Sequence, residues 1–281
     1  MKSQNFGQLM CKPLAKHIGA EIRNIDLTQK LSCSELQSIH DALVFYQVIF
    51  FRDQDISSEN HKDLASFFGP VQVHPAYPHV EEYPEICILE STSKKPTLIE
   101  LWHTDMTFSK TPPLGSILRA WEIPKQGGDT LWASTSAAYD ALSKTMKNIL
   151  EDLVALHSFS YGFKESINLP GGDEKFKQNI LENPPVLHPI VRTHPVTKRK
   201  GLFVNKLFTT HIKNMKSNES EMLLNFLYEH MEQEKFSVRF KWQKNSIAFW
   251  DNRLTIHRPV NDYFPAYRQL RRITIDGDRP E

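Results

Sequence analysis

The stretch Trp102-His103-Thr104-Asp105 carries the strongest signal in this chain, because it sets an imidazole and a carboxylate two residues apart. In an extended segment, side chains alternate between two faces, so His103 and Asp105 point the same way, about 6.6 Å apart along the backbone. In a helix, residues two apart diverge around the axis and do not face one ligand. The following pair Pro112-Pro113 also argues against a helix here. We therefore expect an extended segment whose His103 and Asp105 bind one metal ion.

A third ligand has to come from a distant part of the chain, and His257 is the candidate. Two imidazoles and one carboxylate on one side of a metal leave positions open for a cosubstrate and dioxygen, as in non-haem Fe(II) oxygenases. A jelly-roll barrel brings such remote segments together. The expected fold is therefore α+β, with a double-stranded β-helix (jelly-roll) core and flanking helices.

Two arginines share one face of a predicted strand further downstream. In the run Arg268–Ile275, Arg268 and Arg272 lie on the same face, roughly 13 Å apart, and Arg271 faces out. A buried guanidinium is costly unless it meets an anion, and its planar fork suits a carboxylate or a sulfonate. We therefore expect two bound anions, one for each arginine.

The composition limits the classes of partner. The chain has 281 residues, with 34 Lys and Arg against 33 Asp and Glu, so its net charge of +1 offers no general attraction to nucleic acid or to a membrane surface. The start lacks the apolar stretch of a secretory signal, and no apolar run is long enough to span a bilayer. Its three cysteines have no metal-binding spacing. We expect a cytoplasmic protein that binds small molecules.

The remaining pattern indicates a single domain over residues 1–281, with strands scattered among a few helices. Ser32-Cys33-Ser34-Glu35 has the spacing of a capping box and opens a helix, and a second helix starts at Ser57-Ser58 and stops at Gly69-Pro70. Two more helices are predicted over 136–156 and 218–232, the latter with Met222, Leu223, Phe226 and Leu227 facing inward. Strands are predicted over 85–89, 115–121, 130–132, 186–192, 201–204, 237–242, 246–250 and 270–275.

An ordered series of motifs resembles the taurine dioxygenase family of Fe(II)- and 2-oxoglutarate-dependent oxygenases over nearly the whole length. The series consists of Ile18-Gly19-Ala20, Arg52-Asp53-Gln54, His74-Pro75-Ala76-Tyr77-Pro78-His79, Trp102-His103-Thr104-Asp105, Gly127-Gly128-Asp129-Thr130-Leu131-Trp132, Asn183-Pro184-Pro185, His194-Pro195-Val196, Leu202-Phe203-Val204-Asn205, Trp250-Asp251-Asn252-Arg253 and His257.

This resemblance implies a role for each candidate residue. His103, Asp105 and His257 would bind Fe(II), and Arg268, helped by the Thr130 hydroxyl, would hold the distal carboxylate of 2-oxoglutarate. The substrate sulfonate would be bound by Arg272 and His74, in a pocket lined by Tyr77, Phe163 and Phe208. Dioxygen would be the second cosubstrate.

The resemblance also implies the reaction. The carbon that bears the sulfonate of taurine would be hydroxylated, and the product would collapse to aminoacetaldehyde and sulfite while 2-oxoglutarate yields succinate and carbon dioxide. Two positions depart from taurine-oxidising members, since Ile99 replaces an asparagine near the substrate amine and Gly162 replaces a serine. An apolar side chain leaves an ammonium without a partner, so another small alkyl sulfonate or a sulfate ester is the alternative substrate.

Two other functions fit part of the pattern. A zinc hydrolase would use the same three ligands, but it leaves Arg268 without a purpose. A barrel that binds a small anion without chemistry would not need the three metal ligands. Members of the family are often dimers or larger, which implies a homo-oligomer by analogy.

Overall fold

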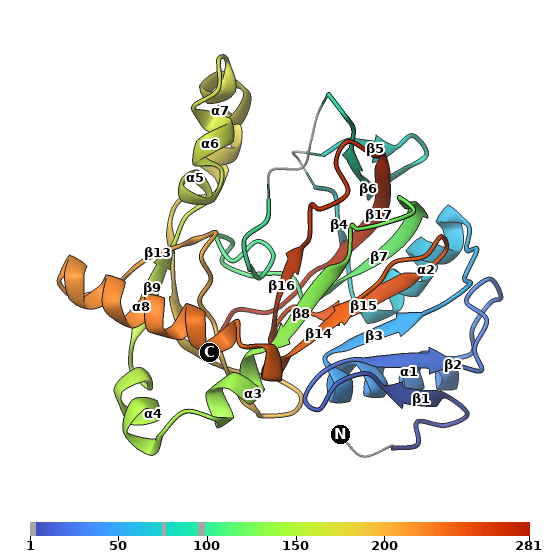
Figure 1. The fold of residues 1–281 in the computed structure, drawn as a ribbon, viewed down its shortest axis with the longest axis horizontal. Helices are drawn as coiled ribbons and strands as arrows, with labels where there is room; N and C mark the ends of the chain where they lie inside the picture. The colour runs from blue at the N-terminus through green and yellow to red at the C-terminus, as the bar shows by residue number, and fades with distance from the viewer. Residues whose placement is uncertain (1–3, 75–76, 95–98) are drawn as a thin grey trace.

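The protein is a mixed α/β structure in which strands from distant parts of the chain form sheets (Figure 1). It is a computed structural model and describes residues 4–74, 77–94 and 99–281. No helix in these ranges is both long and apolar enough to cross a bilayer.

The largest sheet has nine strands, and all but one of its neighbouring pairs are antiparallel. The exception is the parallel pair β2 and β3. The spatial order is β1 (Met10–Pro13), β2 (Ala20–Arg23), β3 (Val48–Phe51), β15 (Ile247–Asp251), β7 (Gly115–Glu122), β17 (Arg268–Ile275), β6 (Tyr83–Ser91) and β5 (His79–Val80), with β4 (Val71–Gln72) also paired to β17.

The central strands of this sheet are buried on both faces. In β15, Ile247 and Phe249 join one hydrophobic cluster while Ala248 and Trp250 join another. This alternation follows from the period of two along a strand. A strand with apolar residues at every position therefore separates two cores.

A second sheet packs on the inner face of the first. It has the order β14 (Ser237–Phe240), β8 (Thr130–Ser134) and β16 (Thr255–Pro259). Trp132 of β8 and Phe240 of β14 share a core with Phe50 and Trp250 of the large sheet, and the Phe50 and Phe240 rings stack 4.1 Å apart. Leu270 of β17 belongs to the same core, so Arg268 and Arg272 face the space between the two sheets.

Helices cover the outer faces of both sheets. Helix α1 (Cys33–Tyr46), which begins with the predicted capping box, and α2 (Ser58–Phe68) pack on the large sheet. Helix α3 (Thr135–Asp140) packs on the small one, beside the 3-10 turn η1 (Glu234–Phe236), and α8 (Ser217–Met231) packs against α3 and the strand β13 (Thr209–Ile212). The result is four layers, with helices outside and two sheets inside.

The remaining elements lie at one side of the layers, where α5, α6 and α7 project from the body in Figure 1. They are α4 (Lys144–Leu150), α5 (Phe159–Gly162), α6 (Lys164–Ile167), α7 (Gly172–Glu182), the sheet β10 (Val186–Pro189), β9 (Val154–His157), β13 (Thr209–Ile212), and the pair β11 (Val191–Thr193), β12 (Lys200–Leu202).

Three predictions about these elements are wrong. The helix over 136–156 is interrupted because Ser143 caps a new helix, α4, and residues 154–157 form β9 between β10 and β13. The strand over 186–192 is two strands in different sheets. In α8, Leu223 and Leu227 are buried as expected, but Met222 and Phe226 are 71% and 42% exposed because the buried face is completed by Leu224 and Tyr228 instead.

Candidate metal centre

His103, Asp105 and His257 come together in the space between the two sheets. The backbones of His103 and His257 exchange two hydrogen bonds, of 2.9 and 2.7 Å, which sets their rings 4.2 Å apart. The Asp105 Oδ1 atom lies 3.7 Å from His103 Nε2 and 3.9 Å from His257 Nε2. All three residues are buried, and their candidate ligand atoms lie within 4.8 Å of one another. This spacing fits a single divalent metal between them.

The segment that carries His103 and Asp105 is not a regular strand. His103 forms an isolated bridge with His257, and the chain turns at Met106, whose φ of 51° is left-handed. The Thr104 side chain points away from the ligands, and its hydroxyl donates to the Thr255 carbonyl over 2.8 Å. The expected alternation of side chains is therefore present, although side chains supply some of the hydrogen bonds that a strand neighbour would supply.

The surroundings of His103 and His257 favour the neutral form of both imidazoles. His103 Nδ1 lies 2.8 Å from the Leu101 carbonyl, so Nδ1 carries the hydrogen and the Nε2 lone pair is free to face Asp105. Burial lowers the pKa of His103 and lowers the pKa of His257 to about 3. An imidazole that stays neutral at pH 7 does not have to lose a proton before it binds a metal.

Asp105 divides its two carboxylate oxygens between different partners. Oδ1 faces the imidazoles, and Oδ2 accepts a hydrogen bond from Arg272 Nη1 at 3.2 Å. Burial would raise the pKa of Asp105, but Arg272, His257 and His103 outweigh it and lower the pKa to about 2. Asp105 is thus an anion, and one of its oxygens is directed toward the metal position.

The anion beside Arg272 is therefore partly supplied by the protein itself. Burial would lower the pKa of Arg272, but Asp105 raises it. Arg272 Nε is buried and has no hydrogen-bond partner among the described residues, so the guanidinium keeps donor capacity for a second anion.

Arg268 lies on the same face and has no ion-pair partner among the described residues. Its Nη2 donates to the Gly128 carbonyl at 3.0 Å, while its buried Nε has no partner in the described part of the chain. Burial lowers its pKa. Thr130, two residues after Gly128, is buried, and its hydroxyl oxygen accepts from Trp242 Nε1 at 2.9 Å, which leaves the hydroxyl hydrogen free to donate. This end of β17 suits a carboxylate.

Two of the residues expected to bind substrate lie against Arg272. The Arg272 guanidinium is 5.8 Å from the centre of the Tyr77 ring, and the rings of Tyr77 and His74 are 4.7 Å apart. Burial, followed by the charge of Arg272, lowers the pKa of His74 to about 3. His74 is therefore neutral in this setting, and the positive charge near it belongs to Arg272.

The aromatic residues form a separate cluster beside the metal segment. Phe208 packs edge-on against Phe108, with centroids 5.0 Å apart, and Phe163 lies 6.0 Å from Phe208. A Cβ atom at Gly162 would lie 2.3 Å from the Phe208 ring, so the glycine lets this ring approach the backbone of α5. The cluster reaches the metal segment through Phe108, three residues after Asp105.

Ile99 is half-buried, and its carbonyl accepts a hydrogen bond from Asn261 Nδ2 at 3.2 Å. The neighbouring Glu100 is the nearest acidic side chain in sequence. It is exposed, and its carboxylate accepts from the Asn261 backbone at 3.0 Å. An acidic partner for an ammonium is therefore not supplied by Glu100 in this conformation.

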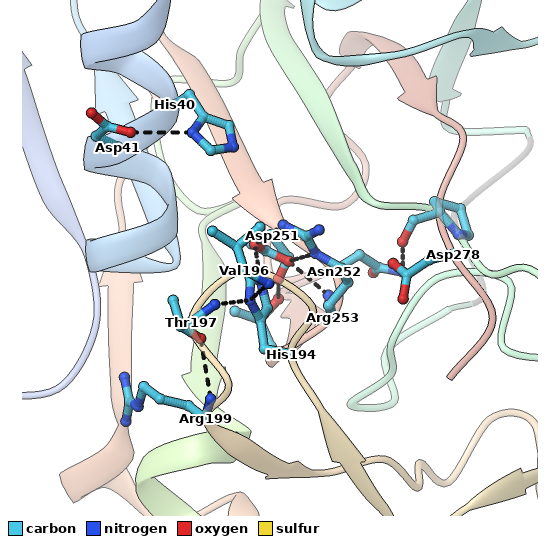
Figure 2. A network of polar contacts seen from close by, with 12 residues as sticks. His40, Asp41, His194, Val196, Thr197, Arg199, Asp251, Asn252, Arg253 and Asp278 are labelled. Carbon is cyan, nitrogen blue, oxygen red and sulfur yellow. Dashed lines mark hydrogen bonds and ion pairs between the residues drawn. The ribbon is translucent and has the colours of Figure 1, made fainter. Parts of the chain in front are cut away.

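A buried polar network at the end of β15 was not predicted from the sequence. Asp251 accepts hydrogen bonds from His194 Nε2 at 2.9 Å and from Arg253 at 2.8 and 2.7 Å (Figure 2). The adjacent Asn252 reaches the backbone of Asp105. These residues lie in two of the motifs that carry the family resemblance, but contacts between residues far apart in the chain leave no spacing pattern that predicts them.

Comparison with known proteins gives a consistent result. The family model described as "Taurine catabolism dioxygenase TauD, TfdA family" matches residues 11–274. An alkylsulfatase of Acinetobacter baylyi is 37% identical over 276 residues, covering 96% of this chain and 86% of that protein. An alpha-ketoglutarate-dependent sulfate ester dioxygenase of Pseudomonas putida is 33% identical over 280 residues, covering 97% of this chain and 91% of that protein.

Two solved structures of related proteins have the same overall fold as this chain. A taurine dioxygenase from Burkholderia xenovorans superposes with a TM-score of 0.84 at 37% identity, covering 98% of this chain and 91% of that one. AAD-2 in complex with Mn(II) and N-oxalylglycine superposes with a TM-score of 0.81 at 32% identity, covering 98% of this chain and 99% of that one.

Proposed function

Because the chain belongs to the taurine catabolism dioxygenase TauD, TfdA family, we propose that it is an Fe(II)- and 2-oxoglutarate-dependent dioxygenase acting on a small organosulfur anion. The observation that carries this proposal is the buried triad of His103, Asp105 and His257, whose ligand atoms lie within 4.8 Å of one another. A metal held from one side leaves room for a chelating cosubstrate.

Different residues bind the metal, the cosubstrate and the substrate. His103, Asp105 and His257 hold Fe(II), which supplies the activation of dioxygen that couples decarboxylation of 2-oxoglutarate to hydroxylation of the substrate. Arg268, with Thr130, binds the distal carboxylate of 2-oxoglutarate. Arg272, His74 and Tyr77 receive the sulfonate or sulfate group, and Phe163, Phe208 and Ile99 border the rest of the substrate. Holding both anions fixes which carbon faces the metal.

A sulfate ester or an unaminated alkyl sulfonate is the substrate we favour, with taurine as the second candidate. Ile99 offers no hydrogen bond to an ammonium, and Glu100 is held by Asn261. The names of the two relatives also support an ester. Hydroxylation of the carbon next to the sulfate would give an aldehyde and inorganic sulfate, whereas a sulfonate would give an aldehyde and sulfite.

The arrangement of the two packed sheets supports a double-stranded β-helix, which we propose as the core of one domain over residues 1–281. A cytoplasmic location and a homo-oligomer stay predictions.

A panel assay tests the function. The purified protein is incubated with Fe(II), ascorbate and 2-oxoglutarate together with medium-chain alkyl sulfates, alkane sulfonates or taurine, and succinate, sulfate and sulfite are measured in parallel. We expect succinate to match sulfate release from the esters in a one-to-one ratio. Sulfite release from taurine alone would instead assign taurine as substrate. Release of sulfate without 2-oxoglutarate would indicate a zinc hydrolase, and no turnover of any compound would contradict the proposal.

A further inference from the structure

The backbone of Asp105 is held by a side chain instead of by a neighbouring strand. The Asn252 carboxamide donates from Nδ2 to the Asp105 carbonyl and accepts at Oδ1 from the Asp105 N–H, both at 3.0 Å. A strand neighbour would offer the same pair of bonds. The backbone pairing of His103 with His257 does not extend to Asp105. At Asp105, the Asn252 side chain supplies the two hydrogen bonds that a neighbouring strand would otherwise form.

Asn252 is itself fixed on all sides. It is 1% exposed, its Nδ2 also lies within 3.3 Å of the Pro113 carbonyl, and its backbone N–H donates to the Leu114 carbonyl at 2.8 Å. Both amide hydrogens and the carbonyl oxygen of the side chain are thus engaged. A carboxamide held in this way has one orientation.

The residue before Asn252 is held by its side chain. Asp251 is buried, and its carboxylate is bound by His194 and Arg253 (Figure 2 shows the Asp251 network). The turn between β15 and β16 carries Asn252 and leads directly to His257. One turn therefore helps to position two of the three candidate ligands, Asp105 and His257.

The chain at Asp105 needs such a constraint. Met106 has a left-handed φ of 51°, a conformation that costs a non-glycine residue free energy and persists only where surrounding contacts hold it. The Asp105 carboxylate also has two competing attractions, the imidazoles on one oxygen and Arg272 on the other. A small rotation of the backbone at residue 105 would move Oδ1 away from the metal position.

We propose that Asn252 is a positioning residue for the metal ligand Asp105. Its carboxamide fixes the backbone of Asp105 and so aims Oδ1 between His103 and His257. This rests on the proposed function only in taking the triad as a metal site; it does not depend on the identity of the substrate.

The test measures metal affinity in the full chain, using Co(II) as the probe and its visible absorption as the readout. Asn252→Ala removes both bonds to Asp105. Asn252→Asp has the same shape and keeps an acceptor for the Asp105 N–H, but it loses the donor to the Asp105 carbonyl. Thr255→Val is the matched control, because it removes one buried hydrogen bond from the same turn without touching Asp105.

We expect both Asn252 variants to bind Co(II) at least ten-fold more weakly, as residues that orient metal ligands commonly show, with a shifted Co(II) absorption band. Thr255→Val should have a lower melting temperature than the parent protein. Its affinity for Co(II) should nevertheless stay within about two-fold of the parent's, because Thr255 does not orient a metal ligand. A loss of less than ten-fold in the folded Asn252 variants, or an equal loss in Thr255→Val, would overturn the proposal. If Asn252→Ala does not fold, the affinity of Asn252→Asp for Co(II) decides. If neither variant folds, Asn252 is a structural residue and the proposal is overturned.

A different result would test the proposed function alone. A parent protein that binds Co(II) but never converts 2-oxoglutarate would refute the proposed function and leave the role of Asn252 intact.

Discussion

Two buried polar regions lie on either side of Asp105 and differ in how completely the protein satisfies them. Around Asp251, both carboxylate oxygens are bonded by His194 and Arg253, and His194 Nδ1 accepts from the Val196 and Thr197 backbones. Along the inner face of β17, by contrast, Nε of Arg268 and Nε of Arg272 are buried without a partner among the described residues.

This difference distinguishes polar residues that stabilise the fold from polar residues that are available to bind a ligand. A buried polar network that is fully bonded stabilises the fold, whereas buried donors without partners are costly unless a ligand meets them. An unpartnered donor alone is not sufficient, since Arg192 also has unpartnered nitrogens and faces Asp278, where the described residues form no group that could bind a metal. The β17 face stands out because its donors converge with the three side chains that could bind a metal.

The largest effect should come from the ligand triad itself. His103→Ala removes one of three metal ligands, so turnover of 2-oxoglutarate should fall by on the order of 10³-fold, because the metal contributes several kcal/mol to the barrier. Succinate formation measures this. Turnover above one tenth of the parent rate would show that His103 is not a ligand.

A large loss of stability should come from the satisfied region. Asp251→Asn leaves the Arg253 guanidinium buried without its anion, so the free energy of unfolding should fall by about 3–5 kcal/mol. Urea denaturation of the metal-free protein measures this. An Asp251→Asn variant as stable as the parent would mean that the network is not structural.

The same substitution should change how stability depends on pH. Burial would raise the pKa of Asp251, but Arg253 and His194 outweigh it and hold the pKa well below the usual value of 3.8. Its contribution is therefore complete above pH 3.8 and is lost as pH falls below that value, at up to about 1.4 kcal/mol per pH unit. Asp251→Asn should lack this part of the acid dependence.

A smaller effect should separate the two faces of β17. Arg268→Gln should raise the KM for 2-oxoglutarate by about 10- to 100-fold, the value of a charge-assisted hydrogen bond, and should not lower the free energy of unfolding. Arg271→Gln is the matched control, since Arg271 lies on the opposite face and stacks on Trp121 at 3.3 Å. Equal changes in KM from both variants would contradict the assignment of Arg268.

The smallest effect concerns specificity. Ile99→Asn adds a hydrogen-bonding group near the expected position of a substrate amine, so the rate on taurine relative to an unaminated alkane sulfonate should rise about two- to ten-fold. Competition assays with both compounds measure the ratio. An unchanged ratio would remove Ile99 from the specificity argument.

The sequence predicted those parts of the molecule that depend on local periodicity. Alternation placed Arg268 and Arg272 on one buried face and Arg271 on the other, and the capping box at Ser32 located the start of α1. Periodicity could not separate α3, α4 and β9 within residues 135–157, because β9 depends on pairing with the distant β10 and β13.

The same limit applies to the site. The residue types of the triad were recognisable from the chain, whereas the pairing of Arg272 with Asp105 and the contact from Asn252 arise only from tertiary packing. Two anions from outside the protein were expected, and the structure supplies part of the second through Asp105.

Among the described residues, the guanidiniums of Arg268 and Arg272 have one ion pair between them, that of Arg272 with the Asp105 carboxylate, so their direct contacts leave an excess of one positive charge. The two charges of bound Fe(II) equal those of the 2-oxoglutarate dianion, so that excess persists until the last ligand arrives. A monoanion such as an alkyl sulfate restores electroneutrality beside these buried arginines, whereas a zwitterion does not. We therefore expect the loaded enzyme to select among organosulfur compounds by their overall valence before it selects by the length of their carbon chains.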